Sequence, residues 1–167
     1  MGRHTDIDER LYAFEAFRGL SPRTMRQIRT LATPIERPAG ATLTRQGRRG
    51  VELVLVLDGT VAVERDGAVI AHRGAADFLG EMSLLGDGVQ TATAVVTAPV
   101  SALVVGKPDF WTLVADVPGL GEHLRRTMVE RQGGAVTDGV GPAPADPVRG
   151  HEPVAVGRFP VPVLGAV

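Results

Sequence analysis

The chain has 167 residues, of which 44 % are hydrophobic, so it can form one domain with a substantial core but not two. Its 18 basic and 19 acidic residues leave a net charge of −1, which excludes a general attraction to nucleic acid or anionic lipid. The absence of cysteine excludes disulfides, thiolate metal sites and cysteine nucleophiles. Residues 1–10 do not form a secretory signal and no apolar run is long enough to span a bilayer, so we expect a cytoplasmic protein with no membrane partner.

Two short helices are predicted before residue 34. Residues 1–13 are mostly polar and are interpreted as an N-terminal extension, and the apolar side of Leu11–Phe17 indicates a first helix that packs on the domain. Ser21 is a typical N-cap, and Pro22 suits the first helical position, where its missing N–H costs nothing. Apolar residues at spacings of three and four predict the buried stripe of this second helix: Met25, Ile28, Leu31 and Ala32.

Turn residues after Pro34 indicate an antiparallel β-protein. Asp58–Gly59 and Asp66–Gly67 each predict a two-residue hairpin, because glycine accepts a positive φ and aspartate tolerates it. The Ala98–Pro99 pair predicts a further turn. The strands divided by these turns are Val51–Leu57, Thr60–Arg65 and Ala68–His72, followed by Gln90–Val96 and Val100–Val105.

The C-terminal part is predicted to contain two helices and a tail. Pro108 begins the first helix; Pro118 ends it and begins the second, which runs to Gln132. Residues 133–167 include seven glycines and six prolines without helical or strand periodicity, so we expect a disordered tail. The apolar faces comprise Phe110, Trp111, Leu113 and Val114 in the first helix, and Leu120, Leu124 and Met128 in the second.

One stretch carries a recognisable motif. The string Phe78-Leu79-Gly80-Glu81-Met82-Ser83-Leu84-Leu85, followed by Thr91-Ala92-Thr93, resembles the cyclic nucleotide-binding domain of catabolite activator proteins and kinase regulatory subunits. The resemblance covers residues 14–132 and implies a mainly β fold. That fold is an antiparallel β-roll or jelly-roll barrel with N-terminal helices, a short phosphate-cassette helix and two C-terminal helices. Further support comes from the spacing of Gly40, Gly47, Gly59 and Gly80 and from the pair Asp109 and Phe110.

The resemblance also implies a ligand site. In this family a Gly-Glu-x-Ala/Ser-Leu segment forms a short helix, and the backbone N–H groups at its start face the cyclic phosphate. By this likeness Gly80 permits close backbone approach, Glu81 accepts the ribose 2′-hydroxyl, and Thr91 follows the position of the family's arginine. The ligand-binding residues that the resemblance implies are Gly80, Glu81, Met82, Ser83, Gln90 and Thr91.

Two positions depart from the family pattern. Gln90 stands where the family has an arginine that binds the phosphate oxygens. A neutral amide lacks about 1.5–3 kcal/mol of charge-assisted bonding, which corresponds to roughly tenfold to a hundredfold weaker binding. A replacement cation could reach the pocket from a nearby loop, and the candidates are Arg48, Arg49 and Arg73. Ala76 stands where a glycine is common.

Two hypotheses follow for the function. The first is a regulatory module that senses cyclic AMP, cyclic GMP or a related nucleotide; the second is a degenerate domain that binds no nucleotide and serves as a protein-interaction scaffold. Neither is an enzyme, because the sequence contains no Gly-x-Ser-x-Gly nucleophile elbow and no glycine-rich loop that ends in Gly-Lys-Ser or Gly-Lys-Thr.

Other sites are not expected. The four histidines are too scattered in the sequence to predict a metal site: His4, His72, His123 and His151. Residues 133–167 lack the two periodic helices of a DNA-binding domain, so we expect no direct DNA binding. The last helix is only about four turns long, which favours a monomer or a weak homodimer. We also expect a separate protein partner.

Overall fold

The structure is a computed structural model that describes residues 2–134, and the side chains of residues 6–133. Almost all of the predicted tail, residues 133–167, therefore lies outside the described residues. The elements in chain order are α1 (Gly2–Tyr12), η1 (Glu15–Phe17), α2 (Pro22–Leu31), β1 (Thr33–Arg37), β2 (Thr42–Thr44), β3 (Glu52–Arg65), β4 (Ala68–Arg73), β5 (Phe78–Leu79), α3 (Glu81–Leu85), β6 (Thr93–Gly106), α4 (Lys107–Asp116) and α5 (Leu120–Gly134).

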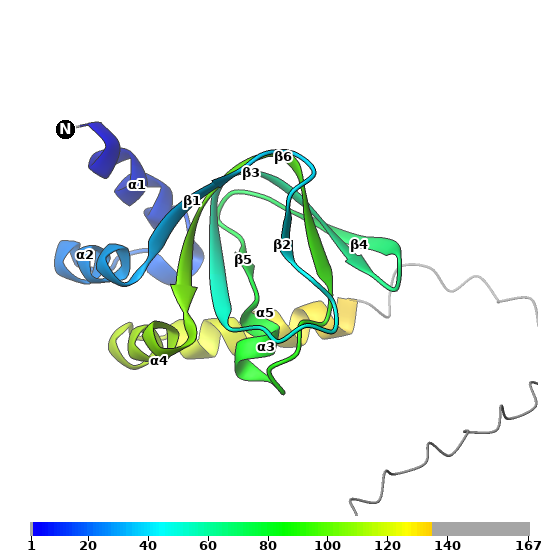
Figure 1. The fold of residues 1–167 in the computed structure, drawn as a ribbon. Helices are drawn as coiled ribbons and strands as arrows, with labels where there is room; N and C mark the ends of the chain where they lie inside the picture. The colour runs from blue at the N-terminus through cyan, green and yellow to red at the C-terminus, as the bar shows by residue number, and fades with distance from the viewer. Residues whose placement is uncertain (1, 135–167) are drawn as a thin grey trace, which may run out of the picture.

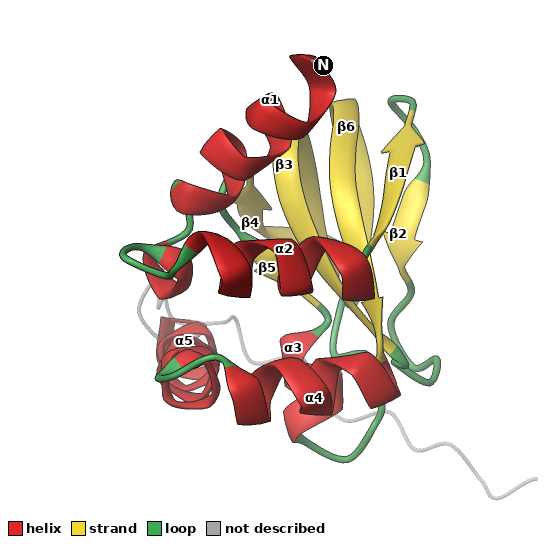
Figure 2. Ribbon diagram, turned by 90° about the vertical axis from the view of Figure 1, so that its left-hand side faces the viewer, coloured by secondary structure: helices red, strands yellow, loops and turns green. Residues whose placement is uncertain are grey.

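The strands form one antiparallel sheet that curls into a roll (Figure 1). Its order is β1-β6-β3-β4, with β2 paired to β6 and β5 paired to β3. Helices α1, α2 and α4 lie along one side of the roll, while α3 and α5 lie beneath it (Figures 1 and 2). The predicted β-roll with flanking helices is confirmed. Among the described residues, no helix combines the length and hydrophobicity needed to cross a bilayer.

Side chains of β3 alternate between two apolar clusters. Leu53 and Leu55 face the cluster that packs against the helices, whereas Val54 and Val56 face the cluster inside the roll. A strand covered on both faces has a continuous apolar sequence rather than an alternating one. This burial explains the uninterrupted run of apolar residues from Leu53 to Leu57.

Two predicted turns are wrong, because Asp58–Gly59 and Ala98–Pro99 lie inside β3 and β6. The two pairs face each other: Asp58 pairs with Ser101 and Thr60 with Ala98, with register shifts on both sides. Gly59 has φ +92, and a Cβ there would lie 2.2 Å from the carbonyl oxygen of Pro99. These residues mark irregularities at which two long paired strands bend together. Pairing on both sides of the bend keeps each strand continuous.

The other predicted hairpin, at Asp66–Gly67, is confirmed. Asp66 has φ 53 and Gly67 has φ 81, and Arg65 pairs with Ala68 across the turn. Positive φ at both central residues is typical of a type I′ turn, whose twist matches that of the flanking strands. Gln46 reinforces the turn, since its side chain accepts a hydrogen bond from the Asp66 N–H at 2.9 Å. The turn brings β4 beside the end of β3.

The N-terminal helix begins earlier than predicted. Instead of a helix over Leu11–Phe17, α1 ends at Tyr12 and a separate 3₁₀ turn spans Glu15–Phe17. The extended backbone of Phe14 separates them and lets Phe14 and Phe17 both pack on Phe78, at ring-centroid distances of 5.0 and 5.8 Å. Leu11 is fully buried as well, so part of the polar segment of residues 1–13 contributes to the core.

The remaining helices form as predicted, except that α5 begins at Leu120 rather than at Pro118 and one residue of a predicted apolar face is exposed. Ser21 caps α2 by accepting a hydrogen bond from the Thr24 N–H at 3.2 Å. In α4, Phe110 and Leu113 are buried, but Trp111 is 41 % exposed and does not belong to the apolar face. Residues 110, 113 and 117 share one side of the helix, and residue 111 is turned about 100° away from it. In α5, Leu120 and Leu124 are buried as predicted.

Candidate ligand-binding site

The predicted short helix forms, and a glycine positions it. Gly80 has φ +87 and precedes α3 directly. A Cβ at this position would lie 2.3 Å from the carbonyl oxygen of Glu52, so β3 and the start of α3 can approach this closely only at a glycine. We call residues Phe78–Leu85 the cassette. It connects a strand in the sheet to a helix beneath the roll.

A cavity of about 430 Å³ opens beside the cassette. Its volume lies within the range of about 300–1,000 Å³ that is usual for small-molecule sites. Three parts of the chain surround it: the ends of β3 and β4, the cassette with the segment that follows it, and the last turns of α5. The uncharged and acidic side chains of its wall include Val63, Ile70 and Ala71 on the sheet, Met82 and Thr91 near the cassette, and Thr127 and Glu130 on α5.

The structure brings two of the six predicted site residues to this cavity. Met82 and Thr91 line it, and the Thr91 hydroxyl donates to the Met82 sulfur at 3.6 Å. Ser83 and Glu81 are buried behind it; the Ser83 hydroxyl donates to the Gly80 carbonyl at 2.8 Å. Residues 80, 81 and 83 therefore shape the cassette but do not form the cavity wall.

Gln90 faces another part of the surface. Its amide nitrogen lies 2.6 Å from where a Cβ on Gly50 would be, and it lines a separate hollow beside Arg45 and Arg48. Its backbone is held there, because its N–H donates to the Arg48 carbonyl at 2.8 Å and its carbonyl accepts from the Gly47 N–H at 2.9 Å. The side chain at this position thus contributes neither charge nor a donor to the cavity wall.

A residue that the sequence reasoning missed contacts the predicted carboxylate. The Nη1 atom of Arg131 in α5 donates hydrogen bonds to the Glu81 carboxylate and, at 2.7 Å, to the carbonyl oxygen of Phe78. Its other terminal nitrogen lies 3.6 Å from Asp77. Glu81 is 1 % exposed, and burial raises its pKa above the ordinary value, because lost hydration outweighs the opposing charge of Arg131. Arg131 therefore tethers α5 to the cassette.

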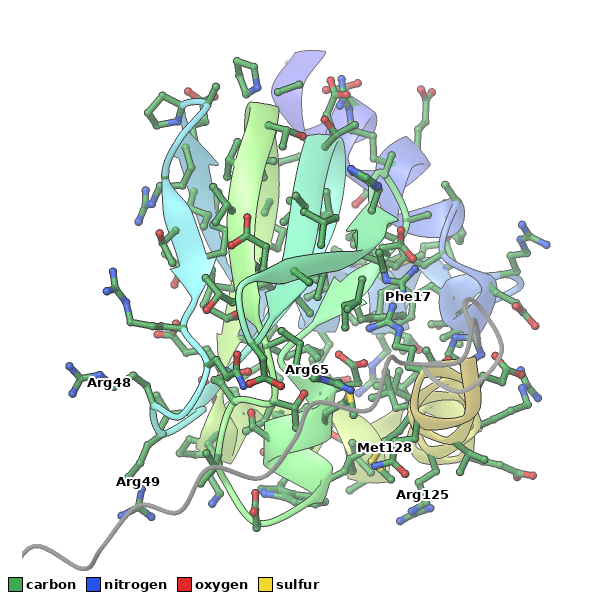
Figure 3. All side chains as sticks on the ribbon, turned by 90° about the vertical axis from the view of Figure 1, so that its right-hand side faces the viewer. Phe17, Arg48, Arg49, Arg65, Arg125 and Met128 are labelled. Carbon is green, nitrogen blue, oxygen red and sulfur yellow. The ribbon has the colours of Figure 1, made fainter. Side chains whose placement is uncertain are left out.

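The cavity contains arginines on the sheet side as well. Of the three arginines considered as replacement cations, only Arg73 lines it. Arg48 and Arg49 project into solvent from the loop before β3, whereas Arg65 lies near the middle of this view and lines the cavity (Figure 3). Arg65 was not predicted, although alternation along β3 places it on the same side as Val61 and Val63.

A β-roll with a short helix inserted between strands, and a cavity beside that helix, defines a ligand-sensing class of fold. Residues 34–116 match the family model of the cyclic nucleotide-binding domain. This part of the chain belongs to that family, and the resemblance inferred from the cassette is confirmed. Domains of this family generally act as sensors rather than catalysts.

Proteins with quite different outputs share this domain. The chain is 32 % identical to a cyclic nucleotide-gated potassium channel of Mesorhizobium japonicum over 75 % of this chain and 35 % of the channel. It is 27 % identical to a CRP-like cAMP-activated global transcriptional regulator of Mycobacterium tuberculosis, over 75 % of this chain and 58 % of the regulator. The chain thus spans less than two thirds of the length of these curated relatives.

A solved structure agrees with these matches. The catabolite activator protein of Thermus thermophilus superposes with a TM-score of 0.64 at 28 % identity. The alignment covers 72 % of this chain and 59 % of that one. The aligned part is longer than the sheet alone, so the similarity includes some of the flanking helices.

Proposed function

We propose that this domain binds a cyclic nucleotide, cyclic AMP or a related one, in the cavity beside the cassette and transmits its presence through α5. The single observation that supports this most is the ion pair between Arg131 and Glu81, which we call the tether. It connects α5, a helix that lines the cavity, to the buried carboxylate of the cassette. Binding in that cavity is therefore coupled to the position of a helix. The named functions of the relatives agree with such a ligand.

The groups around the cavity suit the parts of a nucleotide. The N–H groups of Met82 and Ser83 lie in the first turn of α3, where the helix offers them no acceptor. The Thr91 hydroxyl adds a donor at the same end. Val63 and Ile70 supply an apolar wall against which a base can pack. Phosphate contacts at the cassette remain weaker than usual, because Gln90 supplies no positive charge.

Sensing follows from competition at Glu81. A ligand hydroxyl that hydrogen-bonds to this carboxylate replaces one of the interactions that Arg131 makes with it. The equilibrium between two positions of α5 then shifts by the difference in ligand affinity for each. The chain itself performs no reaction in this proposal; the partner that reads α5 is another protein or another segment.

A titration tests the proposal. Cyclic AMP and cyclic GMP are added up to millimolar concentration while the melting temperature and the fluorescence of Trp111 on α4 are measured. A ligand that binds only the folded state stabilises it by about 2.7 kcal/mol at a hundred times its Kd. The Gln90 amide nitrogen lies 3.8 Å from where a Cβ on Gly80 would be, so a longer, charged side chain at this position starts beside the cassette. The variant Gln90→Arg should therefore bind about tenfold to a hundredfold more tightly. If neither nucleotide shifts the melting temperature of either protein, the proposal fails.

The scaffold hypothesis is the second candidate. Two observations favour it: the Gln90 side chain faces away from the cavity, and Arg131 already occupies the carboxylate that a ribose would need. A degenerate domain would keep the cassette fold and lose the ligand. The scaffold hypothesis predicts that neither nucleotide changes the melting temperature of the wild type or of Gln90→Arg.

A further inference from the structure

The sheet side of the cavity carries two arginines on one face. Arg65 follows Val63 by two positions in β3, and Arg73 follows Ala71 by two positions in β4. Val63 pairs with Ala71 across the two strands. Alternation along a strand places residues two apart on the same face, and all four of these side chains line the cavity. We call Arg65 and Arg73 the wall arginines.

Neither wall arginine has a carboxylate partner in the part of the chain that the structure describes. Among residues 6–133 the ion pairs involve four other arginines, and Arg131 is the one in the cavity that is neutralised, by Glu81 and Asp77. Arg65 donates its Nε to the carbonyl oxygen of Thr91 at 3.3 Å. Arg73 donates to the carbonyl oxygen of its own neighbour, His72, at 3.4 Å. Most donors of both guanidinium groups therefore remain available within the described residues.

The surroundings of Arg73 leave its positive charge incompletely balanced. Partial burial and the nearby charge of Arg131 lower the pKa of Arg73, because Asp77 and Glu81 offset these effects only in part. Glu130 also lines the cavity but is exposed on α5. A bound anion would supply the missing negative charge in a partly dehydrated place, where charge-assisted hydrogen bonds are strong.

We infer that Arg65 and Arg73 form an anion clamp that binds the phosphate of the ligand. The inference rests on the proposed function and names the cations that replace the one absent at Gln90. Arg65 is suited to this role because it contacts Thr91, the residue that directly follows Gln90. An arginine guanidinium presents paired donors that match two phosphate oxygens. The ligand phosphate then lies between the cassette and the sheet rather than in the cassette alone.

Single substitutions test the clamp. Binding of cyclic AMP and of inorganic phosphate is measured by calorimetry for the wild type, Arg65→Gln and Arg73→Gln. Loss of one charged hydrogen-bonding group should weaken cyclic AMP binding by about tenfold to a hundredfold. Arg48→Gln is the matched control, because Arg48 is exposed and does not line the cavity. It should bind as the wild type does. Unfolding curves identify any variant that loses affinity by unfolding.

The outcomes separate the clamp from the proposed function. If Arg65→Gln and Arg73→Gln bind cyclic AMP as tightly as the wild type, the clamp is wrong and the proposed function stands. If phosphate binds and both substitutions weaken it, but no cyclic nucleotide binds, the clamp stands and the proposed function fails. If the wild type binds neither probe, both are wrong. Recovery of cyclic AMP binding in Arg73→Gln by an added Gln90→Arg would further support the clamp.

Discussion

The cassette and helix α5 contribute to the same site in opposite ways. The cassette is a continuous segment in which the Ser83 hydroxyl donates to the Gly80 carbonyl, and Glu81 and Ser83 are almost completely buried. Helix α5 comes from fifty residues further along the chain and reaches the cassette through Arg131. The difference shows that the cassette motif is local, whereas the proposed coupling to α5 depends on a long-range contact.

The largest expected effect comes from removing the tether. Arg131→Met leaves the Glu81 carboxylate buried without its partner, and breaking a buried ion pair costs about 3–5 kcal/mol of unfolding free energy. The matched control is Arg126→Met in the same helix. Its pair with Glu15 joins side chains that are 55 % and 66 % exposed, and such a pair contributes at most about 1 kcal/mol.

Urea denaturation of the two variants measures this difference. Adding Glu81→Gln to Arg131→Met should restore part of the lost stability, because the uncompensated charge is then removed. Equal unfolding midpoints for Arg131→Met and Arg126→Met would show that the tether contributes nothing to the folded state. The coupling between cassette and helix would then need another origin.

A smaller effect is expected from the cassette glycine. Gly80→Ala combines a positive φ, which costs about 1–3 kcal/mol for a non-glycine residue, with a steric clash against the Glu52 carbonyl. Gly67→Ala has a similar φ of +81, but its Cβ would have no atom within 4 Å. We expect Gly80→Ala to lose at least about 1 kcal/mol more than Gly67→Ala, a cost typical of overpacking. Equal losses measured by thermal unfolding would rule out the close approach of β3 to the cassette.

The smallest expected effect is a dependence on pH. Because the pKa of Glu81 is raised in the folded state, the native protein binds a proton at pH values where the unfolded chain has already released it. Stability contributed by this group is thus present below the unfolded pKa, near 4.5, and is lost as pH rises through the folded pKa. Wild type should lose stability relative to Glu81→Gln as pH increases from about 4.5 to 7.

Unfolding free energies of both proteins across this range provide the measurement. Glu15→Gln is the control, since it removes an exposed carboxylate that lies outside the cassette. A wild type that instead gains stability over Glu81→Gln with rising pH would show that attraction to Arg131 outweighs burial. In that case the tether would be strongest when Glu81 is ionised.

Several site and fold features could be predicted because their causes are local. Gly80 and the residues after it indicated a short helix, and Asp66–Gly67 indicated the hairpin that brings β4 beside β3. Asp58–Gly59 carries the same type of signal and was misinterpreted as a turn, because its outcome depends on pairing with β6. A turn dipeptide cannot show whether a distant partner strand continues past it.

The sequence by itself determined the family, the cassette and most of the buried stripes, because these depend on residue type and spacing over a few turns or strands. Only the tertiary structure decided which polar side chains share the cavity. It placed Arg65, Arg73 and Arg131 there and turned Gln90, Arg48 and Arg49 elsewhere. The physical reason is that these contacts join residues up to about fifty positions apart, and their geometry depends on how the sheet curls and where α5 packs.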